Sequence, residues 1–392
     1  MVGRPMLRYI RSALIFTALM LFFIIWRTAV ESANSVEAKS KGMLVAQTRT
    51  SSSLEVEQLA KQVALAPLNQ QLVNAYYVAA VQGLTKLNLR QKNQLRDALA
   101  ALGWRSTAAH QNILMHAVTE NDIKTIALHA DSLLRRQQLT QQIKELLYLF
   151  EASSVGRSEL VERLKLSPPW RTETLTDISG FAGTERLNAR AETLTAMFEA
   201  DLRPTQLELA PVVNQLHENN QKVKSYALWR QFTGKDAEDS SITDRSFNYA
   251  LKARESEYYT EFPYEWRTRR GLGYSSTFFG DGTDAQAVLR WNGSGAPELL
   301  DQYFRKYTGS GIIYISGPNL DLQTVRSLEF SIICNDKRAY FDTLKVINKN
   351  AFVLYSRDKG ACDFPRILIS GKPSNGVSSL EARLSAIELK SN

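Results

Sequence analysis

The chain has 392 residues, of which 44% are hydrophobic and 22% are charged, with 11 prolines and 20 glycines. This composition excludes a fibrous or largely disordered protein, and the length suffices for two or three domains that each bury a core. The net charge is +8, with basic and acidic residues interspersed. Nucleic-acid binding needs clustered Lys and Arg with interleaved aromatic residues, so we expect no nucleic-acid partner. An anionic membrane surface or an acidic polymer fits the charge equally well.

An apolar segment, residues 12–26, follows three arginines near the N-terminus. A bilayer span takes about 20 residues, a length reached if all of residues 9–30 take part. A cleavable signal peptide has a similar apolar segment, but the small-residue cleavage pattern is poor here, which favours an uncleaved anchor. The arginines predict a cytoplasmic N-terminus. We therefore expect one transmembrane helix within residues 1–30, in the cell inner membrane, with the bulk of the chain in the periplasm.

Residues 31–53 are rich in Ser, Thr, Ala and Lys and lack apolar periodicity, which is typical of a flexible stalk. From residue 54 to 254, apolar residues recur at three- and four-residue spacing, in segments separated by short polar connections. This pattern predicts an α-helical domain over residues 54–254. A break could divide it at residues 167–183, where Pro168 and Pro169 interrupt the periodicity.

Within this helical region, small residues fall where paired helices must touch, and a polar turn separates two of the helices. The residues that carry the pattern are Gly103-Trp104-Arg105, Ala117, Asn121-Asp122, Ala127, Ala130 and Leu133-Leu134-Arg135-Arg136. The pattern resembles a tetratricopeptide repeat over residues 54–166. The resemblance implies a solenoid-like array with a surface for protein partners. A non-repetitive helical bundle is the alternative.

Glycines and aromatic residues replace the helical periodicity after about residue 255, and short apolar runs alternate with turn signals. Such runs predict an antiparallel β-sandwich or jelly roll over residues 255–392, so the fold class is α+β and multidomain. The runs are residues 287–291, 311–316, 327–334, 339–347, 351–356, 366–370 and 380–389.

The two cysteines of the chain, Cys334 and Cys362, both lie in this last region. In an oxidising compartment such a pair most often forms a disulfide, and in the cytosol it would remain two free thiols. The predicted membrane anchor favours the disulfide.

Catalytic and metal-binding motifs are weak throughout the sequence. The four histidines lie in the helical region without a partner motif, and we interpret them as surface or partly buried helical residues. Neither a nucleophile elbow nor a phosphate-binding loop occurs, so we expect no cofactor, and an enzyme is the less favoured reading. Asp281 and Asp284 flank a glycine and could donate oxygens to Ca²⁺, although a plain surface turn explains them as well.

Twelve aromatic residues crowd residues 258–307. Sugar-binding modules present Trp and Tyr faces on which pyranose C–H groups stack, with polar side chains nearby for the hydroxyls. The candidate ligand-binding residues are Trp291, Arg290, Asn292, Tyr274, Asp281 and Asp284. Of these we expect Trp291 to be exposed. The region resembles a jelly-roll carbohydrate-binding module, which implies contact with a glycan; the alternative is that the aromatic residues fill the core.

These features predict a membrane-anchored periplasmic scaffold or binding protein that assists the assembly or export of exopolysaccharide or another envelope glycan. Protein partners would bind the helical domain, and a polysaccharide could bind the β-sandwich. Two alternatives remain: a purely protein-binding scaffold, and a polysaccharide hydrolase or lyase in the β-sandwich.

Overall fold

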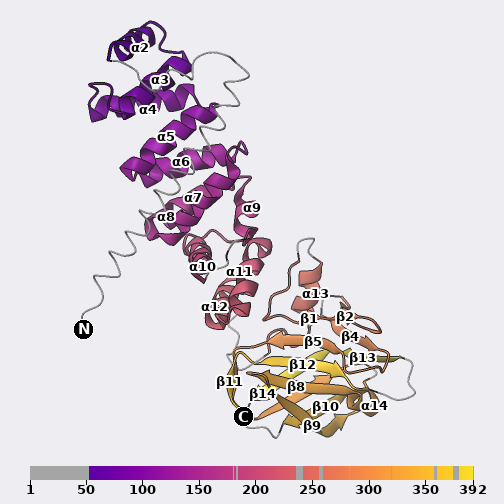
Figure 1. Cartoon of the computed structure of the whole chain (residues 1–392). Coiled ribbons are helices and arrows are strands. Elements are labelled where there is room, and N and C mark those ends of the chain that lie inside the picture. The colour runs from indigo at the N-terminus through magenta and orange to yellow at the C-terminus, as the bar shows by residue number, and fades with distance from the viewer. Residues whose placement is uncertain are drawn as a thin grey trace, which may run out of the picture. The chain divides into compact units, whose positions relative to one another are not determined.

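The computed structural model describes residues 53–391, except for 180, 182–183, 235–241, 256–258, 282, 319, 357–359 and 374–378. The predicted anchor, residues 1–30, and residues 31–52 of the predicted stalk lie outside the described residues. The last residue of the predicted stalk, Ser53, is described as the start of the first helix. Within the described part of the chain, no helix has both the length and the apolar character of a membrane span. The chain divides into two compact units, residues 1–150 and 151–392, and each is taken by itself below (Figure 1).

The first unit is built from helices in succession, as the periodicity predicted. Buried side chains of α3, α4 and α5 form one apolar cluster, which includes Tyr77, Leu99 and Ile113, and α6 and α7 bury further apolar residues such as Leu133 and Leu146. The helices are α2 (Ser53–Leu65), α3 (Gln70–Val81), α4 (Leu89–Leu102), α5 (Thr107–Glu120), α6 (Ile123–Leu134) and α7 (Thr140–Ala152), the last of which crosses into the second unit. The resemblance of these helices to tetratricopeptide repeats stays a prediction.

Polar residues immediately before the helices fix where they begin. Asn69, Asn88, Ser106 and Asp122 each accept a hydrogen bond from a backbone N–H in the first turn of the helix that follows. Such N-caps satisfy donors that have no partner within the helix. The helix boundaries in this unit are therefore set by local sequence.

Further helices open the second unit. They are α8 (Ser154–Leu164), α9 (Arg171–Thr176), α10 (Thr184–Glu199), α11 (Gln206–Glu218), α12 (Lys222–Thr233) and α13 (Asn248–Arg254). Two ion pairs, each with a buried carboxylate, connect the early helices. Arg190 of α10 is fully buried and its Nε lies 2.5 Å from Oε1 of Glu151. Arg171 of α9 donates two hydrogen bonds of 2.9 Å to the carboxylate of Glu208 in α11.

The described residues after α13 form antiparallel β-structure in three sheets. The eight-stranded sheet has the order β1 (Arg267–Thr268), β5 (Glu298–Tyr303), β12 (Arg366–Gly371), β8 (Leu328–Cys334), β9 (Lys337–Asn348), β10 (Ala351–Ser356), β7 (Gly311–Ser316) and β14 (Ala386–Ser391). The four-stranded sheet has the order β13 (Leu380–Leu384), β4 (Gln286–Trp291), β3 (Tyr274–Phe279) and β2 (Arg270–Gly271). A small third sheet pairs β11 (Cys362–Asp363) with β6 (Lys306–Tyr307), and one short helix, α14 (Leu322–Arg326), precedes β8.

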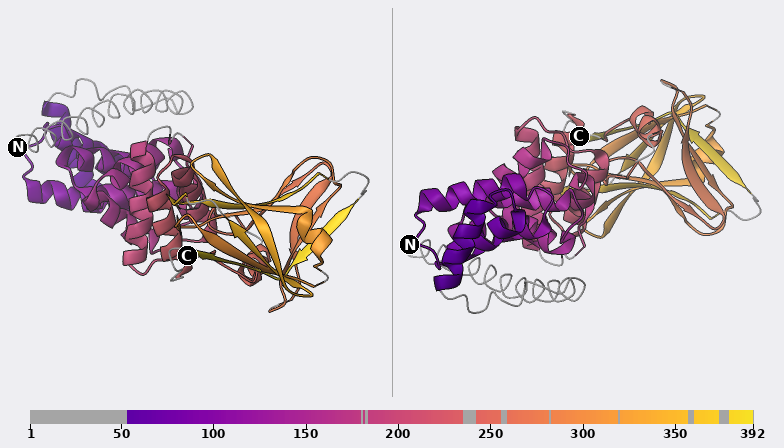
Figure 2. Two further views of the ribbon diagram at one scale, coloured as in Figure 1. Left: turned by 90° about the horizontal axis from the view of Figure 1, so that it is seen from below. Right: turned by 90° about the horizontal axis from the view of Figure 1, so that it is seen from above.

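The two larger sheets share one apolar core, and Figure 2 shows their strands in two facing layers. The core contains Trp291 and Leu289 from the four-stranded sheet and Phe330, Ile367 and Phe352 from the eight-stranded sheet. The predicted α+β class, with antiparallel sheets toward the C-terminus, is confirmed. The arrangement is sandwich-like.

The last predicted strand, residues 380–389, is two strands in different sheets. The chain changes sheet at Ser385, whose N–H donates to the carbonyl of Ser316 over 2.7 Å. β13 pairs with β4, whereas β14 pairs with β7. Gly317 makes this crossing possible, because a Cβ at that position would lie 1.8 Å from the carbonyl oxygen of Arg383. The alternation of apolar and polar residues shifts by one position at the crossing, where Ala386 and Ile387 are consecutive apolar residues. The buried residues change there from Ala382 and Leu384 to Ile387 and Leu389, so this shift is the local sign of the change of sheet.

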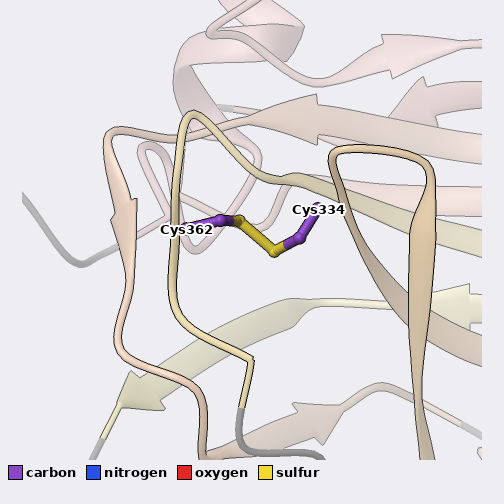
Figure 3. Close-up of a disulfide and its surroundings, with 2 residues drawn as sticks. All are labelled: Cys334 and Cys362. Atoms are coloured by element: carbon purple, nitrogen blue, oxygen red, sulfur yellow. A yellow bond between two sulfur atoms is a disulfide. The ribbon is translucent and has the colours of Figure 1, made fainter.

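The predicted disulfide between Cys334 and Cys362 is confirmed (Figure 3). The two Cα atoms lie 5.9 Å apart. Cys334 ends β8 of the eight-stranded sheet, and Cys362 begins β11 of the small sheet. The bond therefore fastens the small sheet to the large one.

Candidate functional site

The expectation that Trp291 is exposed is wrong. Its side chain is only 2% exposed, because β4 presents this residue to the core. The indole packs so closely on Gly371 that a Cβ there would lie 2.8 Å from two ring atoms. The alternative reading, in which the aromatic residue fills the core, holds for Trp291.

The other predicted ligand-binding residues lie at opposite ends of the hairpin formed by β3 and β4. Tyr274 is half-buried and pairs across the strands with Trp291, next to exposed Asn292. Asp281 and Asp284 are exposed in the connection at the other end. A strand of this length separates the two groups by roughly 17–20 Å, so they do not form one site.

Two details of this hairpin bear on the predicted chemistry. Arg290 is exposed and its Nε donates to Glu381 of β13 over 2.7 Å. In the described residues no three side chains among His, Cys, Asp and Glu are grouped so that they could hold a metal ion. Asp281 and Asp284 therefore gain no third ligand of these types among the described residues.

Among the described residues, three arginines gather around one carboxylate at Asp301 of β5, a residue that no sequence motif indicated. The Asp301 side chain is fully buried. Nε of Arg267 and Nε of Arg366 each lie 3.0 Å from Oδ2, and Nε of Arg269 lies 2.9 Å from Oδ1. We call Arg267, Arg269 and Arg366 the arginine cluster.

The strand register places this cluster on the face of the eight-stranded sheet that points away from the core. Residues directly opposite each other on paired strands share a face. Arg267 is opposite Asp301, and Asp301 is opposite Leu368. The neighbours of Leu368 along β12, Ile367 and Ile369, both belong to the core. Leu368 and Asp301 therefore lie on the outer face, beneath the arginine side chains.

The three arginines of the cluster carry more positive charge than the carboxylates beside them carry negative charge. Burial alone would raise the pKa of Asp301, but the three guanidinium groups outweigh burial and hold that pKa below its ordinary value. Arg366 also pairs with Glu298, so three cations face two anions. Three guanidinium groups carry about 15 N–H donors, against about eight lone-pair sites on two carboxylates. Donors therefore remain for water or for an anionic ligand.

The arginines remain accessible to such a ligand. Their side chains are 20%, 37% and 16% exposed for Arg267, Arg269 and Arg366, respectively. Arg338 of β9 lies in the same cross-strand row as Arg366, two strands away, and donates to Ser331 over 2.9 Å. Two strand spacings put the backbones of Arg366 and Arg338 about 10 Å apart. The outer face thus carries basic groups in a row across the strands.

Comparisons with known proteins add no family to this geometry. No protein-family model matches the chain, and no characterised protein shows significant similarity to it.

Helices α11 and α12 connect to this face through a cluster of aromatic residues. The Arg267 guanidinium lies 5.2 Å from the centre of the Tyr303 ring, and the ring of His217 in α11 lies 4.2 Å from it. The Tyr264 hydroxyl donates to the Lys222 carbonyl, so we assign the proton to Nδ1 of His217, which lies 3.2 Å from that hydroxyl. The helices are therefore packed directly beside the arginine cluster.

The prediction that all four histidines are surface or partly buried is wrong for three of them. His110, His129 and His217 are 6%, 4% and 8% exposed. His110 and His129 come from neighbouring helices of the first unit, and their Nδ1 atoms lie 2.7 Å apart. Spacing within one helix could not reveal a contact between two helices.

We expect both units to lose stability as the pH falls from about 7 to 4. Burial, with smaller contributions from nearby cations, lowers the pKa of His129 and of His217 from 6.5 to about 4. Above pH 6.5 these two histidines are neutral in both the folded and the unfolded protein. Between pH 6.5 and 4 they take up protons only in the unfolded protein, which stabilises the unfolded state relative to the folded one. At 1.36 kcal/mol per pKa unit the loss approaches about 3 kcal/mol in each unit at pH 4.

Urea unfolding at a series of pH values, followed by circular dichroism, measures this loss. His129→Gln should flatten the pH dependence of the first unit, and His217→Gln that of the second unit. A free energy of unfolding that stays constant from pH 7 to 4.5 in the unmodified protein would contradict the prediction.

Proposed function

We propose that this protein is a membrane-anchored periplasmic binding protein that assists the assembly or export of an envelope glycan. In this proposal the helices bind protein partners, and the outer face of the eight-stranded sheet binds an acidic polysaccharide. The observation that carries the proposal is the arginine cluster, where three guanidinium groups surround one buried carboxylate and keep donors available to solvent.

The disulfide supports the proposed compartment. Structural disulfides persist in oxidising environments such as the periplasm and are rare in the cytosol. Cys334 and Cys362 are bonded and both pack against the core of the sheets. An exported sheet domain agrees with an anchor that leaves the N-terminus in the cytoplasm.

The geometry of the outer face supports an acidic polymer as the ligand. Arginine binds carboxylate and sulfate groups through two parallel N–H donors, which gives both strength and orientation. The spacing between Arg366 and Arg338, about 10 Å between backbones, is comparable to the length of a disaccharide. A polymer with a charged group on alternate sugars would therefore meet successive arginines.

Affinity electrophoresis of the full chain in gels that contain a polyuronate or a neutral glucan tests the proposal. We expect retardation by the polyuronate, weakened by added salt. Arg269→Ala removes the most exposed arginine of the cluster, and we expect at least about tenfold weaker binding, because one hydrogen bond to a charged group contributes roughly 1.5 kcal/mol or more.

Arg290→Ala is the matched control, since Arg290 is also an exposed arginine paired with one carboxylate but belongs to the other sheet. It should leave the retardation unchanged. Equal retardation by both polymers would contradict the proposal. Recovery of a protein complex without any retardation would favour the pure scaffold, and turnover of the polymer would favour the hydrolase or lyase.

The compartment is tested separately. A reporter enzyme that folds only in the periplasm should be active when fused to the C-terminus. A reporter that works only in the cytosol should be inactive at the same position. Free alkylation of both cysteines in the native protein would overturn the assignment to an oxidising compartment.

A further inference from the structure

The stretch from residue 58 in α2 to residue 96 in α4 differs in charge from the rest of the chain. Between residues 58 and 96 there is no Asp or Glu, whereas five basic residues occur: Lys61, Lys86, Arg90, Lys92 and Arg96. The even mixture of charges noted for the chain therefore has an exception, and it falls directly after the predicted anchor and stalk.

The connection between α3 and α4 has a conformation fixed at both ends. Gly83 has φ +77° and ends α3, with its N–H bonded to the Ala80 carbonyl and the N–H of Leu84 bonded to the Ala79 carbonyl. This pair of bonds is a Schellman motif. Asn88 begins α4 and forms a reciprocal capping box with Gln91.

This well-defined connection presents leucines to solvent rather than to the core. The side chains of Leu84 and Leu89 are 42% and 63% exposed, and Lys86 and Arg90 beside them are also exposed. We call these four residues the amphiphilic loop. The turn between α2 and α3 repeats the feature, with Leu65 and Leu68 at 87% and 81% exposed.

We infer that the amphiphilic loop lies on the surface of an anionic phospholipid bilayer. Leucine side chains enter the boundary between headgroups and acyl chains, while Lys and Arg contact the phosphates, which is how interfacial segments bind membranes. The absence of acidic residues from 58 to 96 favours this occupant, because nothing in that stretch repels an anionic surface.

Position along the chain supplies a second argument, which rests on the anchor of the proposed function. With a transmembrane segment in residues 1–30, only residues 31–52 separate the bilayer from α2. Tethering at this short distance raises the effective concentration of lipid at the loop, so even weak interfacial contacts are populated. The contact would fix the first unit against the membrane.

Fluorescence quenching in vesicles tests the inference with the full chain. A fluorophore on Thr85→Cys, within the loop, reports contact with brominated lipids, and one on Gln138→Cys, an exposed position in the same unit, serves as the reference. The proteins are added to vesicles of phosphatidylcholine alone or of phosphatidylcholine with phosphatidylglycerol. We expect strong quenching at position 85 only when phosphatidylglycerol is present, and weak quenching at position 138.

Two double variants separate the apolar and the electrostatic contributions. Leu84→Ser with Leu89→Ser should abolish the quenching at position 85. Lys86→Glu with Arg90→Glu should remove its dependence on phosphatidylglycerol, because each basic residue near an anionic surface contributes roughly fivefold to binding. Lys345→Glu with Lys349→Glu, in the β9–β10 hairpin, is the charge-matched control and should leave the quenching unchanged.

The outcomes distinguish this inference from the anchor itself. Vesicle binding with equal quenching at positions 85 and 138 would keep the anchor and overturn the loop contact. Absence of vesicle binding by the full chain would overturn both. Protection of the label at position 85 in intact envelopes, without quenching in vesicles, would assign the loop to a protein partner instead.

Discussion

Replacement of Arg190 by Ala is expected to lower the free energy of unfolding of the second unit by about 3–5 kcal/mol. Arg190 is fully buried and Glu151 is 1% exposed, so neither charge can be solvated if its partner is lost. Arg190 Nη1 also donates to the carbonyls of Thr174 and Leu175, over 2.9 and 2.8 Å. The substitution therefore leaves a buried carboxylate and two backbone acceptors without this donor. Chemical denaturation followed by circular dichroism measures the loss.

A second set of variants shows whether the buried pair itself causes the loss. Lys165→Ala breaks an exposed pair with Glu162, 2.7 Å apart, and should change stability by no more than about 0.5 kcal/mol. The double variant Glu151→Leu with Arg190→Met should be more stable than Arg190→Ala, because it leaves no unpaired buried charge. A loss for Arg190→Ala as small as that for Lys165→Ala would show that the pair is not buried in solution.

Replacement of both cysteines, Cys334→Ser with Cys362→Ser, is expected to destabilise the same unit by about 3–4 kcal/mol. The bond closes a loop of 28 residues, and a covalent loop of that length restricts the unfolded chain by this amount. Both residues also pack against the core of the sheets, so the substitution removes apolar contacts as well. Differential scanning calorimetry should show a lower transition temperature for the second unit.

Chemical reduction supplies the control for this experiment. A reductant should lower the transition temperature of the unmodified protein to nearly that of the double variant, and it should leave the double variant unchanged. The transition of the first unit, which contains neither cysteine, should respond to neither treatment. A reductant-insensitive unmodified protein would contradict the stabilising role of the bond.

The sequence predicted the parts of the fold that local chemistry determines. Apolar periodicity predicted the helical region between residues 54 and 254, because an amphipathic helix buries one face. Polar caps fix the starts of α3, α4, α5, α6, α8 and α11. Runs of β-branched and aromatic residues located β4, β7, β8, β9, β10 and β12. The lone cysteine pair predicted the disulfide. None of these predictions required knowledge of which elements meet.

Long-range pairing determined the rest. β5 escaped prediction because Asp301 and Gln302, both fully buried, interrupt its apolar residues. Asp301 is tolerated there because Arg267 of β1, Arg366 of β12 and Arg269, between β1 and β2, surround its carboxylate. The sequence signals that could have indicated the cluster are the Asp that follows two leucines in β5 and the Arg-Thr-Arg alternation at residues 267–269. Trp291 was misplaced for a related reason, since composition cannot tell which face of β4 points inward.

The change of sheet at Ser385 has a consequence for how the molecule folds. One short stretch of chain supplies an edge strand to each large sheet, and its two halves pair with β4 and β7, both far away in the sequence. Pairings between distant segments form slowly, whereas the helices of the first unit pack largely against their neighbours along the chain. The helices should therefore reach their native contacts first, while both sheets still expose open edges. This interval is when the chain is most prone to aggregation, and a chaperone that shields strand edges would act on it then.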